Sequence, residues 1–162
     1  MINDDDLFTI AKREDIPLNA VFFKDDPPNL IHAGGYIINL QDSALGLGGS
    51  HFCAMYVPPK IHQIAYMDSM GFPPSQSTIN WVKTSQYKNY PICYNTKNIQ
   101  NINSGGCGIY SLYFIQFCDK HRTNIPMDEL IEKFGDMFSD DSKKNLEILK
   151  KLAPYYMNSK TI

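Results

Sequence analysis

Four side chains spread along the middle of the chain have the types needed for thiol-based hydrolysis: His51, Asp68, Gln100 and Cys107. Such chemistry needs a thiolate nucleophile, an imidazole that takes and delivers the proton, and a group that orients the imidazole. It also needs a donor aimed at the oxyanion of the tetrahedral intermediate. Cys107, His51 and Asp68 suit the first three roles. The amide of Gln100 suits the fourth, because it offers N–H donors without carrying charge.

The surroundings of Cys107 suit a nucleophile. Glycines stand on both sides of it, and the apolar run 109–118 that follows predicts a helix buried in a core. With Ser104 as the N-cap, Cys107 lies in the first turn. Unpaired backbone N–H groups and the positive end of the helix dipole favour a thiolate there. A small buried core residue is the alternative, and this stretch alone leaves the two interpretations even.

His51 and Asp68 are expected to meet across a pair of strands. Residues 51–57 and 62–68 are short apolar runs of strand length, separated by a turn at Pro58-Pro59-Lys60. Symmetric pairing about this turn places His51 directly opposite Asp68, with Cβ atoms ~5 Å apart. A register slip of one residue would break the contact, because it sends the side chains to opposite faces.

Further helices and strands must surround these elements. Amphipathic patterns predict helices over residues 4–13, 77–83, 126–138 and 142–152, and strands over 20–23, 36–40 and 91–94. Asp5 or Asp6 is expected to cap the first helix. The sequence predicts an α+β fold in a single domain over residues 1–162. A central mixed β-sheet packs against the buried helix that carries Cys107, and helices from both termini flank it.

Composition excludes several classes of function. The 162 residues include 43% hydrophobic residues and carry a net charge of −2, which is typical of a globular core without a general attraction to nucleic acid or anionic membranes. Four cysteines without a CxxC or regular spacing indicate a reducing, intracellular setting. The acidic start predicts no secretory signal, and no apolar run approaches the ~20 residues of a membrane span.

The order and spacing of His51, Asp68, Gln100 and Cys107 resemble those of adenain, the adenovirus-type maturation endopeptidase. Residues 48–51 resemble the motif around that family's histidine. Residues 68–72 resemble its acidic residue and the Gly-Phe turn that follows, and residues 100–110 are similar to its oxyanion and nucleophile motif. SUMO-specific proteases share the same order more loosely. The similarity covers roughly residues 4–120 and is most specific over residues 100–110.

The resemblance implies an adenain-like, papain-type fold and a thiol protease that needs no cofactor or metal. It implies that His51, Asp68 and Cys107 are catalytic and that Gln100 forms the oxyanion hole. The residues implied in substrate binding are Gly49, Ser50, Phe52, Gly105 and Gly106. Relatives of this kind occur in adenoviruses, virophages and Polinton-like elements. They imply cleavage next to glycine in capsid and core precursors during virion maturation.

Two features depart from the family's pattern. Phe52 stands where the residue after the histidine is usually Trp, and Cys93 does not match the spacing of the cysteine that links an activating peptide. Adenain-type enzymes can be stimulated by DNA as well as by such a peptide, but this chain is mildly acidic overall, so neither activator is carried over. The expected protein is a monomer without a membrane partner. It acts in the virion and the host-cell cytoplasm, at the virus factory, and is not secreted.

Other interpretations remain open at this stage. A protease acting on ubiquitin-like modifiers shares the chemistry, and a non-catalytic virion interaction protein would share the fold. Zinc held by His51, Cys53 and Cys107 fits no usual ligand spacing. Cys53 alternates with His51 and is expected to pack rather than line the site. Cys93 and Cys118 are expected in the core.

Overall fold

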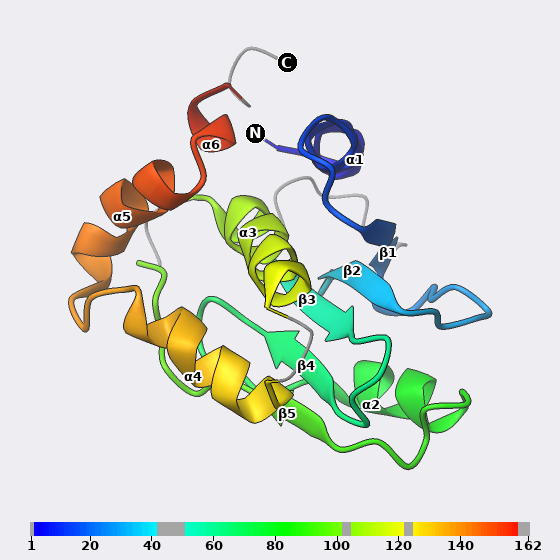
Figure 1. The fold of residues 1–162 in the computed structure, drawn as a ribbon. Helices are drawn as coiled ribbons and strands as arrows, with labels where there is room; N and C mark the ends of the chain where they lie inside the picture. Colours follow the sequence, from blue (N-terminus) through cyan, green and yellow to red (C-terminus); the bar gives the residue numbers. More distant parts are fainter. Residues whose placement is uncertain (1, 42–50, 102–104, 122–124, 159–162) are drawn as a thin grey trace.

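The computed structural model describes residues 2–41, 51–101, 105–121 and 125–158 (Figure 1). A five-stranded sheet forms its centre, with the strands in the same order in space as in sequence. The strands are β1 (Leu18–Phe23), β2 (Gly34–Asn39), β3 (Phe52–Val57), β4 (Ile64–Met67) and β5 (Ile92–Tyr94). The two outer pairs are parallel and the two inner pairs antiparallel, which confirms the mixed sheet.

Helices cover both faces of this sheet. They are α1 (Asp4–Arg13), α2 (Gln76–Lys83), α3 (Cys107–Lys120), α4 (Met127–Asp136), α5 (Asn145–Leu152) and α6 (Tyr155–Asn158), with a 3₁₀ turn η2 (Ser142–Lys144) before α5. The α+β class is confirmed. Two predicted caps are wrong. The N-cap of α1 is Asn3, in a capping box with Asp6, rather than Asp5 or Asp6. The N-cap of α3 is Gly106 rather than Ser104. Within the described ranges, no helix is long and apolar enough to span a bilayer.

Alternation along the strands divides the core into two clusters. On one face, Ile37, Ala54 and Met67 pack with α1, α3 and α4. On the other face, Ile38 and Tyr66 pack with Trp81 of α2 and its neighbours. Because successive strand residues point to opposite faces, both sides of the central strands must be apolar. This explains why β2, β3 and β4 are buried at every position.

Helix α3 lies across β2 and β3 at the centre of the first cluster (Figure 1). Ile109, Leu112, Phe114 and Ile115 are all 0% exposed, as the continuous apolar run predicts. A glycine permits the close approach to the sheet, because a Cβ on Gly35 would lie 2.4 Å from the Ile115 side chain. Because this packing holds α3 against the sheet, it also holds Cys107, the first residue of the helix, in a fixed place.

The pairing of β3 with β4 differs from the predicted register. Ala54 pairs with Met67 and Tyr56 with Ala65, so extending the ladder places Asp68 opposite Cys53 rather than His51. The direct pairing of His51 with Asp68 is therefore wrong. The connection runs from Pro58 to Gln63, so its centre lies later than a turn at Pro58-Pro59-Lys60. The residue opposite Asp68 thus changes from His51 to Cys53, a shift of two positions. Because the shift is an even number, the His51 and Asp68 side chains still point to the same face of the sheet.

Candidate active site

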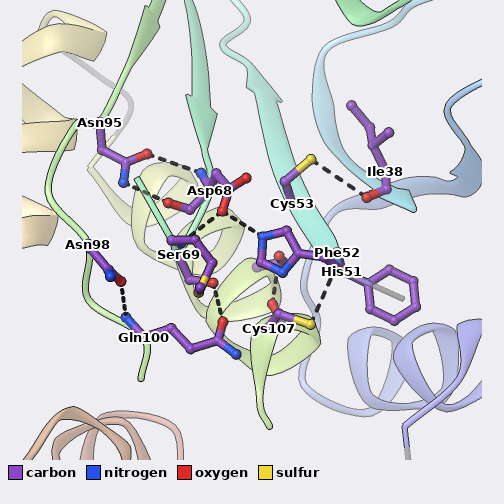
Figure 2. A network of polar contacts seen from close by, with 12 residues as sticks. Ile38, His51, Phe52, Cys53, Asp68, Ser69, Asn95, Asn98, Gln100 and Cys107 are labelled. Atoms are coloured by element: carbon purple, nitrogen blue, oxygen red, sulfur yellow. Dashed lines mark hydrogen bonds and ion pairs between the residues drawn. The ribbon is translucent and has the colours of Figure 1, made fainter. Parts of the chain in front are cut away.

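His51 and Asp68 meet where β3 begins and β4 ends (Figure 2). The ring Nε2 of His51 lies 2.6 Å from Oδ1 of Asp68. The extended ladder makes the two residues diagonal neighbours, and a diagonal separation is within reach of a long side chain. The side chain of Asp68 is 0% exposed and that of His51 is 26% exposed, so the imidazole alone faces solvent. The predicted contact is confirmed.

Asp68 is held by contacts on both its side chain and its backbone. Its Oδ1 also accepts the backbone N–H of Met70 at 2.8 Å. Asn95, directly after β5, accepts the Asp68 N–H at 3.1 Å and donates Nδ2 to the Asp68 carbonyl at 2.7 Å. The Asn95 amide thus continues the pairing of β4 with β5 by one more step. Sequence reasoning missed Asn95, because an asparagine after a strand carries no local signal of such a contact.

The charge state of His51 follows from its neighbours. Burial lowers its pKa, but hydrogen bonds with Asp68 and Cys107 act in the opposite direction and raise the pKa to about 9. The negative charges of the same two partners add to the effect. Because this value lies above neutrality, the imidazole is protonated at neutral pH. The group can therefore deliver a proton from the resting state.

Cys107 is the first residue of α3, so its predicted place in the first turn is confirmed. The N-cap is Gly106, with φ of +106°, and Ser104 lies outside the described residues. The backbone N–H of Phe52 donates to Sγ of Cys107 at 3.4 Å, which links the start of β3 to the start of α3 (Figure 2).

Gln100 is 5% exposed and is held by Ser69, the residue after Asp68. The Ser69 hydroxyl donates to Oε1 of Gln100, and the Ser69 carbonyl accepts the Gln100 N–H at 3.0 Å. Figure 2 shows the Gln100 side chain extending from its loop toward the start of α3, with the amide nitrogen on the side away from Ser69. Ser69 was predicted only as part of a turn.

The remaining candidate residues differ in their surroundings. Gly49 and Ser50 lie outside the described residues. A Cβ on Gly105 would meet nothing within 4 Å, so the space beside that residue is open. Phe52 is 6% exposed, and its ring packs beside Gly108 in the core, so the site receives mainly its backbone N–H.

The other cysteines are unsuited to nucleophilic chemistry. Cys53 and Cys118 are 0% exposed, and burial raises the pKa of both thiols. Cys53 accepts the Tyr66 hydroxyl at 2.9 Å, so it packs beneath the site, as expected. Cys93 is half-buried rather than in the core, and burial raises its pKa too. In the described part of the chain, no group of three His, Cys, Asp or Glu side chains could hold a metal ion.

Comparison with known proteins gives a likeness in fold. No protein-family model matches the chain, and no curated protein matches its sequence. Among solved structures, the ASFV protease aligns over 90% of this chain and 63% of its own, with 15% identity and a TM-score of 0.53. HopZ1a in complex with IP6 and CoA aligns over 93% of this chain and 52% of its own, with 15% identity and a TM-score of 0.48. The SUMO protease Ulp1 aligns over 72% of this chain and 53% of its own, with 14% identity and a TM-score of 0.32.

The likeness to the ASFV protease shows that the two chains share a fold. This chain spans less than two thirds of the length of each of these three proteins. Because a fold hosts many activities, the activity must be argued from the site itself.

Proposed function

We propose that this chain is a cysteine endopeptidase with a Cys107–His51–Asp68 triad. One observation carries the proposal: the His51 ring is hydrogen-bonded to the buried carboxylate of Asp68 and lies close to Cys107, the first residue of a buried helix. The fold shared with the ASFV protease supports it. A merely structural histidine would not need to bridge a buried acid and a thiol.

In this proposal, each group performs one step of the reaction. The Cys107 sulfur attacks the scissile carbonyl carbon. The developing oxyanion accepts hydrogen bonds from the Gln100 amide and from backbone N–H groups of the first turn of α3. The His51 imidazolium gives its proton to the leaving amine, which departs as the tetrahedral intermediate collapses to a thioester. Neutral His51 then removes a proton from water, which hydrolyses the thioester. Asp68 keeps the ring oriented and stabilises its charge throughout.

The substrates we propose are viral capsid and core precursor proteins, cut next to glycine. The similarity of residues 100–110 to the adenain motif supports this class. The open space at Gly105 also supports it, because an extended glycine-containing backbone needs close approach to the nucleophile rather than side-chain pockets. The setting proposed is the virion and the cytoplasm of the infected cell.

The test is to incubate the protein with the capsid and core proteins encoded by its own genome. New N-termini are then mapped by mass spectrometry. The proposal expects cuts beside glycine in extended segments with the parent protein and none with Cys107→Ala. Repeating the assay with added DNA, and with peptides derived from the precursors, determines whether either one activates the protein.

Two other functions predict different outcomes. A protease for ubiquitin-like modifiers would release the fluorophore from a C-terminal modifier conjugate, and would leave the capsid precursors intact. A non-catalytic interaction protein would bind a precursor without cutting it, and Cys107→Ala would bind equally well. Cleavage of precursors that survives in Cys107→Ala would refute the proposed mechanism outright.

A further inference from the structure

Two consecutive residues after β4 hold two different parts of the candidate site. Asp68 holds His51, and Ser69 holds Gln100 (Figure 2). Ser69 is 1% exposed, and it makes three contacts with the loop that carries Gln100. Its carbonyl accepts the N–H groups of Ile99 and Gln100 at 2.9 and 3.0 Å, and its hydroxyl donates to Oε1 of Gln100.

The hydroxyl contact matters because an amide has two nearly identical ends with opposite properties. One end accepts hydrogen bonds through oxygen, and the other donates through nitrogen. Rotating the terminal amide by half a turn preserves its shape and exchanges the two ends. Only the nitrogen end can stabilise an oxyanion, whereas the oxygen end would repel it. Some contact must therefore select the end that faces the substrate.

We propose that Ser69 is a positioning residue that fixes the donor end of the Gln100 amide toward the oxyanion. By donating to Oε1, the Ser69 hydroxyl holds the oxygen end on its own side and turns Nε2 away from itself. The assignment rests on the proposed protease function. Ser69 touches no reacting atom and acts only through Gln100.

The backbone contacts separate this role from a general structural one. Replacing Ser69 by Ala removes the hydroxyl but keeps the carbonyl that accepts Ile99 and Gln100. The loop therefore stays attached, while the amide loses the hydrogen bond that holds its oxygen end toward Ser69. Contacts of Asp68 with Met70 and Asn95 do not involve the Ser69 side chain, so His51 should keep its environment.

The first test is a double-mutant cycle on a mapped peptide substrate with Ser69→Ala, Gln100→Ala and the double variant. We expect Ser69→Ala to lower kcat by about 10-fold, part of the ~10²–10³-fold cost of losing an oxyanion donor, with KM and the pH profile unchanged. In the Gln100→Ala background it should have no further effect. The matched control is Ser85→Ala, which removes a half-buried hydroxyl bonded to a carbonyl of α2 and should keep parental kcat.

Three results would overturn the positioning role: parental kcat in Ser69→Ala, an equal loss in both backgrounds, or a shifted pH profile. A second test does not depend on activity, so it remains available if no variant, the parent included, cleaves any peptide and the proposed function fails. Nuclear Overhauser contacts in isotope-labelled protein report whether the Gln100 amide protons lie beside the β-protons of Ser69. The proposal expects no such contact in the parent protein, and a strong contact would overturn it.

Discussion

Nε2 of His51 lies 2.6 Å from Oδ1 of Asp68, although neither residue belongs to a strand and they are diagonal rather than facing neighbours across β3 and β4. The diagonal contact depends on the position of Asp68, which Met70 and Asn95 hold through side-chain and backbone hydrogen bonds. Changes to Asp68 should therefore appear first as changes in the titration of His51.

Asp68→Asn should move the alkaline limb of kcat/KM to lower pH. The hydrogen bonds with Asp68 and Cys107 raise the pKa of His51 to about 9, and removing one negative charge brings that pKa down toward 6.5. Catalysis needs the imidazolium as the acid, so as the pH rises the variant should lose activity at a lower pH than the parent protein does. Asn can still accept a hydrogen bond, so kcat should fall less than in Asp68→Ala. Asp140→Asn, at a fully exposed side chain, is the control. An alkaline limb unchanged in Asp68→Asn would show that another group orients His51.

The free energy of unfolding should also depend on this contact. The pKa of His51 is higher in the folded protein, about 9, than its ordinary value of 6.5. The contact therefore stabilises the fold fully below pH 6.5, and this contribution is lost as the pH rises through 9. Urea unfolding across this window should show a steeper loss of stability in the parent than in Asp68→Asn. Parallel pH dependences would contradict the assignment.

Gln100→Ala should lower kcat by about 10²–10³-fold with little change in KM, the usual result of removing one oxyanion donor. Gln100→Glu should be worse at neutral pH, because a carboxylate repels the same charge. Alkylation of Cys107 by iodoacetamide should continue in both variants, since that reaction develops no oxyanion. If labelling were also lost, Gln100 would be supporting the loop rather than the transition state.

Sequence patterns predicted the elements of this fold well, because each pattern reports on burial along one element. The apolar run 109–118 became α3, and residues 4–13 became α1. Strand register and side-chain contacts between distant loops were harder to predict from the sequence. The position of Asp68 depends on where the connection after Val57 ends, and Asn95 reaches Asp68 only because β5 pairs with β4. No local pattern encodes either fact.

The glycines before Cys107 should differ in what they tolerate. A Cβ on Gly105 meets nothing within 4 Å, so Gly105→Ala should leave the melting temperature unchanged and lower kcat/KM by crowding the substrate. Gly106 has φ of +106°, and its Cβ would lie 3.4 Å from the Tyr156 ring. Gly106→Ala should therefore destabilise the protein by about 1–3 kcal/mol. Thermal unfolding and kinetics separate the two effects. Full activity in Gly105→Ala would place the substrate elsewhere.

The central claim is that Cys107 forms a thioester with the acyl half of the substrate. The most direct measurement is mass spectrometry of the protein, quenched in acid during turnover of a mapped peptide and then digested at low pH. The account predicts a mass increase equal to the acyl half of the substrate on the peptide that contains Cys107. No such adduct should form in Cys107→Ala, and the peptides that contain Cys53, Cys93 and Cys118 should be unmodified. Turnover that continues in Cys107→Ala, or an adduct on another residue, would contradict the account.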